Sequence, residues 1–204
     1  MSSLFTGTAQ VSHKTKLPAG VTKASAVAML HDHAFYLECD PHLVKYSALD
    51  ADKVASLKKT SKLPKGIGGG GGSETRYYEV HDLVHNLPGG LWDSNVVSSY
   101  EMTDTPEGVF VRIRSPMSVV MDTYWTIREM PAGEVAENGD KTPGGLAIVE
   151  EITIIAPRLV VGIVKGLCEG GWKKIHDKML TRFQAPGQAA AASIPPAAPV
   201  QAES

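Results

Sequence analysis

One stretch near the C-terminus constrains the fold of this chain more than any other. Between residues 157 and 183, apolar residues recur at helical spacing. Pro157 suits the first turn of a helix, where its missing N–H would be unpaired anyway, and Lys178 and Arg182 place positive charge near the end. Such a helix would be about 40 Å long. We therefore expect a long helix whose apolar face packs on a larger surface supplied by the rest of the chain.

The middle of this predicted helix carries a stripe without side chains. Gly162, Gly166 and Gly170 follow each other at intervals of four residues. Glycine inside a helix costs about 1 kcal/mol relative to alanine, so the stripe needs a reason. Close packing against a sheet is the favoured one, because ligand pockets are few per protein. Space left for a ligand is the alternative.

The rest of the chain is dominated by predicted strands. Turn signals separate closely spaced strand patterns, which favours antiparallel hairpins over crossover units. Residues 23–37 form an amphipathic helix with Thr22 as its N-cap, and residues 50–62 are an exposed turn or short helix. We predict an α+β fold in which a strongly curved antiparallel sheet of six or seven strands wraps around the long helix. The predicted strands span residues 5–17, 43–49, 76–87, 92–103, 109–115, 117–130 and 146–156.

Two segments fall outside this pattern. Residues 62–73 are a glycine-rich loop that we expect to be flexible, and residues 184–204 are rich in Ala and Pro and should be disordered. The loop contains a literal GxGxxG, but no helix follows it, which argues against a dinucleotide-binding fingerprint. Residues 1–183 then form a single domain.

Composition excludes several functional classes. The net charge is −2 with a pI near 6.4, so a nucleic-acid partner is not expected. Two cysteines cannot form a disulfide framework or a four-cysteine zinc site. No apolar run reaches the length of a membrane span, and the first ten residues lack the features of a signal peptide. We expect a cytoplasmic protein without a membrane span.

Several short sequence groups, spread over residues 5–183, carry a family likeness. They are Leu30-His31-Asp32-His33, Tyr77-Tyr78-Glu79-Val80 with Asp82, Leu87-Pro88-Gly89-Gly90, Trp125-Thr126, and Gly145-Leu146 with Glu150. With the order of elements, they resemble an uncharacterised, mainly fungal family within the START and polyketide-cyclase-like (SRPBCC) superfamily. The resemblance implies the helix-grip fold, with a cavity between sheet and helix that binds sterols, lipids, hormones or polyketides. Some relatives carry the ligand, whereas others cyclise, isomerise or dehydrate it with one or two side chains.

Glu150 is the main candidate for chemistry. In the strand 146–156, alternation places Glu150 on the more apolar face, toward the helix and the cavity, and Glu151 on the other. A carboxylate among aliphatic side chains is costly to ionise, which suits a general acid or base. The alternatives are that Glu150 pairs with a basic residue at the sheet edge, or that the facing is reversed and Glu151 lies inside.

The other candidates are weaker. His31 and His33 lie about 200° apart on a helix and cannot both bind one metal, so no metal site is predicted, although His33 could reach the cavity mouth. His33 and Tyr100 are the reserve proton carriers. Aromatic and methionine residues on the concave side are more often core than ligand contacts. The residues predicted to line the substrate site are Trp92, Met117, Met121, Trp125, Ile154, Val164 and Leu167.

Two functions remain open from the sequence. The first is a cofactor-independent cyclase, isomerase or dehydratase of secondary metabolism, acting on a small hydrophobic polyketide- or terpenoid-type intermediate. The second is a carrier or sensor that binds a lipid or small apolar molecule without changing it. An enzyme needs a buried, unpaired polar group in the pocket, whereas a carrier needs only orienting contacts. A homodimer is compatible with either function.

Overall fold

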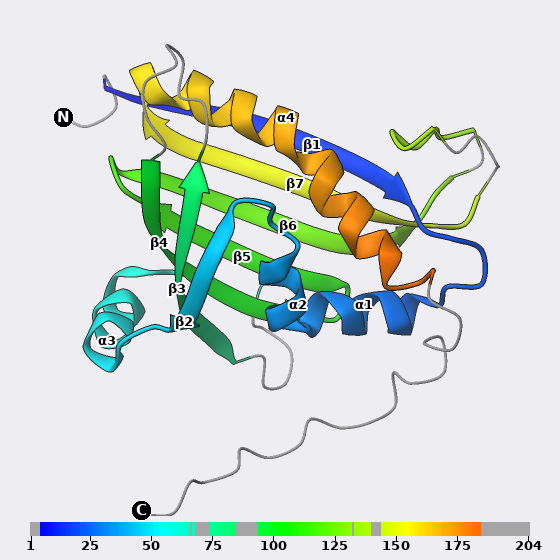
Figure 1. Ribbon diagram of the computed structural model, residues 1–204, viewed down its shortest axis with the longest axis horizontal. Helices are drawn as coiled ribbons and strands as arrows, with labels where there is room; N and C mark the ends of the chain where they lie inside the picture. The colour runs from blue at the N-terminus through cyan, green and yellow to red at the C-terminus, as the bar shows by residue number, and fades with distance from the viewer. Residues whose placement is uncertain are drawn as a thin grey trace, which may run out of the picture.

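The computed structural model describes residues 5–65, 67, 74–84, 94–131, 133–139 and 144–184. Its centre is one antiparallel sheet of seven strands, in the order β1-β7-β6-β5-β4-β3-β2 (Figure 1). From β2 to β7, each strand pairs with the next strand in the sequence. Strand β1 pairs with β7, the last strand, and forms one edge of the sheet. The strands are β1 (Thr6–Lys16), β2 (Leu43–Ala48), β3 (Thr75–Val84), β4 (Ser94–Thr105), β5 (Gly108–Ser115), β6 (Val119–Glu129) and β7 (Leu146–Pro157).

Four helices accompany the sheet, and three of them cover its inner face. The long helix α4 (Arg158–Thr181) begins directly after β7 and runs along β1 and β7 (Figure 1). Helix α1 (Lys23–His31) packs on β5 and β6, and α2 (His33–Glu38) continues from it toward β2. Helix α3 (Ala51–Thr60) buries no residue and stands at the corner beside β2 and β3. This is the predicted α+β architecture, a curved sheet with a C-terminal helix of the helix-grip type.

The strands sort their side chains between an inner face toward α4 and an outer face. In β7, Ile152 and Ile154 are buried, whereas Glu151 before them and Ile155 after them are exposed. This alternation follows from the period of two in a strand. Glu150 therefore lies on the inner face, as the sequence predicts. The main core lies between the inner face, α1, α2 and the last turns of α4.

The predicted helix of residues 23–37 is divided in the structure. Asp32 ends α1 with a ψ of 82°, outside the helical range, and its carboxylate accepts a hydrogen bond from the N–H of Phe35 at 3.2 Å, which caps α2. An aspartate favours such an N-cap because its side chain satisfies a backbone donor that lacks a partner. Thr22 caps α1 in the same way, as expected.

The glycine stripe of α4 corrects a second expectation. A Cβ atom added at Gly162, Gly166 or Gly170 would meet no heavy atom within 4 Å. The stripe is exposed, so the prediction of close packing against the sheet is wrong. Helix α4 instead packs through Val160, Val161, Val164 and Cys168. Most of the loop 62–73, including its glycine run, and the tail from residue 185 lie outside the described residues.

Candidate functional site

The inner face brings Glu150 into a row of large side chains. Glu150 pairs across the ladder with His13 of β1 on one side and with Trp125 of β6 on the other. Side chains of directly opposed residues share a face of the sheet. Glu150, His13 and Trp125 are 5%, 7% and 2% exposed, so the row is almost closed to solvent.

Helix α4 places a histidine over this row. His176 is fully buried, and its Nε2 lies 3.5 Å from Oε2 of Glu150. Its other ring nitrogen, Nδ1, is 2.7 Å from Oγ1 of Thr15, which lies two residues beyond His13 on the inner face of β1. Neither Glu150 Oε2 nor His176 Nε2 makes a hydrogen bond, so the two atoms face each other unsatisfied.

Aromatic rings enclose the pair. Trp172, one turn before His176, stacks on His13 with ring centroids 4.6 Å apart and meets the His176 ring edge-on at 5.2 Å. Trp125 lies 5.1 Å from the His176 ring, and Tyr36 of α2 meets Trp125 edge-on at 5.6 Å. The indole N–H of Trp125 approaches Tyr36 without reaching hydrogen-bond geometry. These rings exclude water and strengthen electrostatic interactions inside the site.

The hydrogen bond to Thr15 couples the two protonation states. If the hydroxyl of Thr15 donates to Nδ1 of His176, the proton of the neutral ring is on Nε2 and faces the carboxylate of Glu150. If Nδ1 donates to Thr15, Nε2 presents a lone pair, which suits a protonated Glu150. In both arrangements one proton lies between the two residues. The pair can therefore give a proton to a substrate or take one from it.

A second group of polar side chains lies on the inner face of β3 and β4. Tyr100 is 8% exposed, and burial raises its pKa well above the ordinary value, with Asp82 and Asp40 adding to the increase. Asp82 is 9% exposed and its Oδ1 has no hydrogen bond. Burial raises the pKa of Asp82 to about 7, and the negative charge of Asp40 adds to this increase.

Tyr36, which packs on Trp125, and Cys168, on the packed side of α4, respond to charges of both groups. Burial raises the pKa of Tyr36 well above its ordinary value, and the charges of Glu150 and, to a lesser extent, Asp40 add to it. Burial likewise raises the pKa of the Cys168 thiol to about 12, again with contributions from Glu150 and Asp40. Both side chains are thus close enough to sense the two acidic ends of the inner face.

His33, a reserve proton carrier, occupies a different place. Its Nε2 lies 2.8 Å from Oδ1 of Asp104, and its Nδ1 lies 3.1 Å from the hydroxyl of Tyr78. Asp104 in turn has its pKa lowered through its hydrogen bond to His33 and the charge of that ring, which outweigh burial. His31 instead reaches the carbonyl oxygens of Thr105 and Gly108. These contacts join the helices to the β4–β5 hairpin, away from Glu150.

The predicted lining residues are divided by the structure. Trp125 and Ile154 are buried on the inner face, and Met121 and Val164 are half-buried near them. Leu167 is 41% exposed on α4. Met117 is a correction: it lies at the hairpin turn between β5 and β6 with a φ of 60°, is 68% exposed, and does not line the inner face. Trp92 lies outside the described residues.

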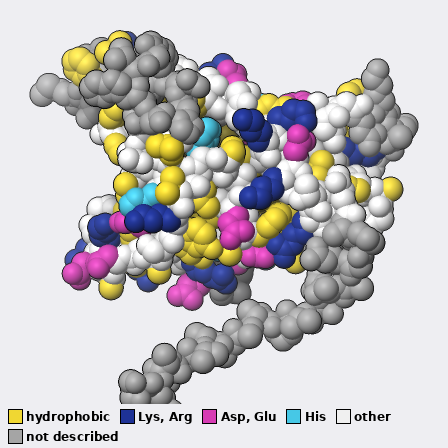
Figure 2. All heavy atoms as spheres, in the orientation of Figure 1, with side chains coloured by type: hydrophobic (Ala, Val, Ile, Leu, Met, Phe, Trp, Pro, Cys, Tyr) yellow, Lys and Arg dark blue, Asp and Glu magenta, His cyan; other side chains and the backbone are white. Residues whose placement is uncertain are grey.

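The register places Met121 in a half-buried apolar row. Tyr78, Tyr100, Ile113, Met121 and Ile154 are opposed in turn across five strands, β3 to β7. This row lies four residues along β7 from the row of Glu150. Figure 2 shows hydrophobic side chains reaching the surface near α2 and β2, among charged ones.

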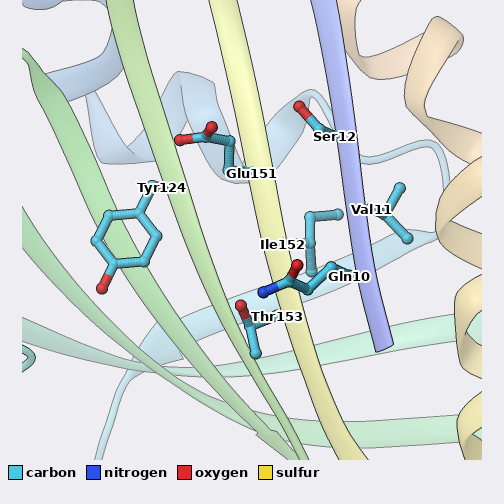
Figure 3. Close-up of a pocket in the computed structure, with 7 residues that line it drawn as sticks. All are labelled: Gln10, Val11, Ser12, Tyr124, Glu151, Ile152 and Thr153. Carbon is cyan, nitrogen blue, oxygen red and sulfur yellow. The ribbon is translucent and has the colours of Figure 1, made fainter. Parts of the chain in front are cut away.

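The outer face offers only shallow features in the part of the chain that the structure describes. One hollow of about 400 Å³ is lined by polar side chains of β1, β6 and β7, including Gln10, Glu151 and Tyr124 (Figure 3). Arg128 pairs with Glu151 at 3.1 Å beside it. Among the described residues, no group of three or more His, Cys, Asp or Glu side chains could hold a metal ion. None of the described helices is long and apolar enough to cross a membrane.

Comparison with known proteins gives one decisive match. Residues 6–185 match the family described as Domain of unknown function (DUF7053). The chain belongs to this family. No curated protein matches the sequence. The structure is similar to that of an uncharacterized protein from Rhizobium leguminosarum, with 10% identity, a TM-score of 0.44, and coverage of 88% of this chain and 96% of that one. A likeness at this level supports no conclusion about function.

The most informative residues of this DUF7053 chain were only partly visible in the sequence. His176 follows Cys168 and Trp172 at intervals of four residues, so it shares their helical face. That spacing was a signal for an inward-facing histidine. His13 is two residues from both Val11 and Thr15, so it shares their inward face of β1, which is a weaker signal. Nothing local indicates that both histidines meet Glu150.

Proposed function

We propose that this protein is a cofactor-independent acid–base enzyme, a cyclase, isomerase or dehydratase, that acts on a small hydrophobic molecule held against the inner face of the sheet. One observation carries the proposal: Glu150 Oε2 and His176 Nε2 lie 3.5 Å apart, and both lack hydrogen bonds. Buried polar atoms in folded proteins are nearly always satisfied, so an unsatisfied pair needs an explanation. A proton-transfer pair is such an explanation.

The surroundings support a hydrophobic substrate. Ile113 and Met121, in the middle of the apolar row, are half-buried, so they present hydrophobic surface beside the site. Trp125 and Tyr36 supply rigid aromatic walls next to Glu150. A surface that holds a flexible molecule in a reactive conformation contributes to catalysis through orientation. We place the chain in the START and polyketide-cyclase-like superfamily and expect a polyketide- or terpenoid-type intermediate of secondary metabolism.

In the proposed mechanism, Glu150 exchanges a proton with the substrate, and His176 replaces or accepts that proton. Thr15 holds the His176 ring through the 2.7 Å contact at Nδ1, so that Nε2 stays directed at Glu150. Thr15 is therefore a positioning residue. The aromatic rings around the pair keep bulk water from exchanging the proton.

The test uses the metabolite that accumulates in a strain lacking the gene. The purified metabolite is incubated with the wild-type protein and with the variants Glu150→Gln and Glu151→Gln, and products are separated by chromatography and identified by mass spectrometry. Gln keeps the shape of Glu but cannot carry its proton. We expect Glu150→Gln to lose turnover by at least about 100-fold, and Glu151→Gln, on the outer face, to retain it.

Two results would contradict the proposal. Full turnover by Glu150→Gln would remove this residue from the mechanism. If the wild-type protein binds the metabolite without converting it, the carrier function is correct instead. The half-buried apolar row of the inner face is the observation that favours this second candidate, because such a surface binds a ligand without needing a proton carrier.

A further inference from the structure

Asp82 is a buried acidic side chain that the proposed reaction does not use. It lies on the inner face of β3 with Val80 and Tyr78, is 9% exposed, and its Oδ1 makes no hydrogen bond. A buried carboxyl oxygen without a partner is costly, and the same fold would form with an apolar residue there. The site therefore has a capacity for a hydrogen-bond donor that the described part of the chain does not fill.

A second carboxylate lies in the turn that is bonded to this end of β3. Asp40 lies in the turn between α2 and β2, where its Oδ1 accepts a hydrogen bond from the backbone N–H of His42 at 2.8 Å. The backbone N–H of Leu83 donates to the carbonyl oxygen of His42 at 2.9 Å, which ties this turn to the end of β3. The negative charge of Asp40 contributes to the raised pKa of Asp82, as expected for two carboxylates close together.

Burial raises the pKa of Asp82 by more than the charge of His81 lowers it. His81 precedes Asp82, so it points to the opposite face of β3, where its Nε2 lies 3.1 Å from Oε1 of Glu79. Lys53 also pairs with Glu79, at 2.6 Å. The outer face of this strand therefore uses its own cations. Tyr100 of β4 is opposed to Tyr78, so it shares the inner face with Asp82, and its phenol can donate or accept a hydrogen bond.

We propose that Asp82, Asp40 and Tyr100 form a subsite that binds the protonated amine of an otherwise hydrophobic ligand. An ammonium group supplies three donors and one positive charge, which matches two carboxylates and a phenol oxygen. The apolar row that contains Tyr100, Ile113 and Met121 offers the adjoining surface for the hydrophobic part. A neutral hydroxyl would satisfy Asp82 but would leave the excess negative charge without a counterion.

This inference rests on the proposed function in that it narrows the class of substrate to hydrophobic amines. Tyr36 of α2 packs on Trp125, which is opposed to Glu150, and Asp40 follows the end of the same helix, so α2 connects the amine subsite with the proton-transfer pair. An amine held at Asp82 would fix one end of a ligand whose other part extends toward Glu150.

The test compares three probes with the same alkyl chain: octylamine, which is protonated at pH 7, 1-octanol and octanoate. Binding to the full chain is measured by isothermal titration calorimetry. We expect the wild-type protein to bind octylamine at least about tenfold more tightly than 1-octanol, and octanoate more weakly than either. Asp82→Asn, which keeps the shape but not the charge, should lose the preference for the amine over the alcohol. Glu79→Gln, on the outer face of the same strand, should keep it.

A second measurement separates this subsite from general attraction to an acidic surface. Octylamine binding favours the ionised form of Asp82, so it should release protons at pH 7, detected as a dependence of the binding heat on the buffer. 1-Octanol should release none. Equal binding of amine and alcohol by the wild type, no binding of any probe, or an unchanged preference in Asp82→Asn would overturn the inference. Glu150→Gln should retain the amine preference, so failure here and failure of the proposed catalysis are distinguishable.

Discussion

Substituting Asp82 by Asn should change how the stability of this protein depends on pH. Burial, with a contribution from Asp40, raises the pKa of Asp82 from 3.8 to about 7. In the folded protein this carboxyl therefore keeps its proton at pH values where the unfolded chain has already lost it. Below pH 4, both states hold the proton and there is no penalty. As the pH rises from about 4 to 7, ionisation favours the unfolded chain and the wild-type protein loses stability.

The magnitude follows from the two pKa values. At about 1.4 kcal/mol for each pH unit between 3.8 and about 7, the loss approaches about 4 kcal/mol as an upper bound. Above pH 7 it should become constant, because both states are then ionised. Asn cannot ionise, so Asp82→Asn should lack this loss. Relative to the wild type, the variant should gain about 3–4 kcal/mol in free energy of unfolding between pH 4 and pH 8.

The assay is urea denaturation followed by tryptophan fluorescence at several pH values from 4 to 8. At each pH, the free energy of unfolding of the wild type is subtracted from that of the variant. The change of this difference with pH is the result to be compared, because any effect of the buried amide that does not depend on pH cancels. Glu151→Gln, which alters an exposed carboxylate on the outer face of β7, is the control and should show a much smaller change. A difference for Asp82→Asn that stays constant within about 0.5 kcal/mol over this range would refute the reasoning.

Three further predictions concern packing, a turn and the cysteines. Trp125→Ala should lower the free energy of unfolding by about 3–5 kcal/mol, because the indole is 2% exposed; a loss below about 1 kcal/mol in urea denaturation would show that the ring is not part of the core. Met117 and Ser118 have φ values of 60° and 59°, a conformation that Asn and Gly adopt more easily. Met117→Asn combined with Ser118→Gly should therefore stabilise the hairpin by about 1 kcal/mol. An unchanged or lower melting temperature would contradict this. Burial raises the pKa of both Cys39 and Cys168 to about 12. Neither thiol should therefore react appreciably with a disulfide reagent at pH 8 until urea unfolds the chain. Rapid labelling of the native protein would show that the thiols are accessible.

The local sequence pattern was sufficient to predict the main helices and strands, and to predict that Glu150 faces the inside of the sheet. Glu150 shares the more apolar face of β7 with Ile152 and Ile154, and a period of two leaves only two registers relative to the core, so Glu150 could be assigned inward and Glu151 outward. The long helix and the hairpin succession also follow from periodicity and turn residues. By contrast, the break at Asp32 could not be predicted from periodicity. The apolar pattern favours one continuous helix, whereas the carboxylate of Asp32 favours a new helix start by capping α2.

Which side of helix α4 packs on the sheet was harder to predict than which side of a strand faces the core, and the reason is physical. Helix α4 has two apolar sides: Val160, Val164 and Cys168 pack on the sheet, whereas Leu159 and Leu167 are exposed. A sequence pattern does not say which side meets the sheet, so the glycine stripe could not be placed. The rotation of the helix is seen only in its packing against the sheet through Val160, Val164 and Cys168.

The composition of the candidate site was decided by tertiary structure. His13, Trp125 and His176 are distant from Glu150 in the chain or belong to other elements, and strand register and helix docking bring them together. A backbone hydrogen bond between Leu83 and His42 likewise brings the turn that holds Asp40 to the end of β3 that holds Asp82. The sequence determines which residues share a face of a strand or helix, because side-chain direction follows from local backbone geometry. Which inward residues become neighbours depends on contacts between distant segments, and these exist only in the folded chain.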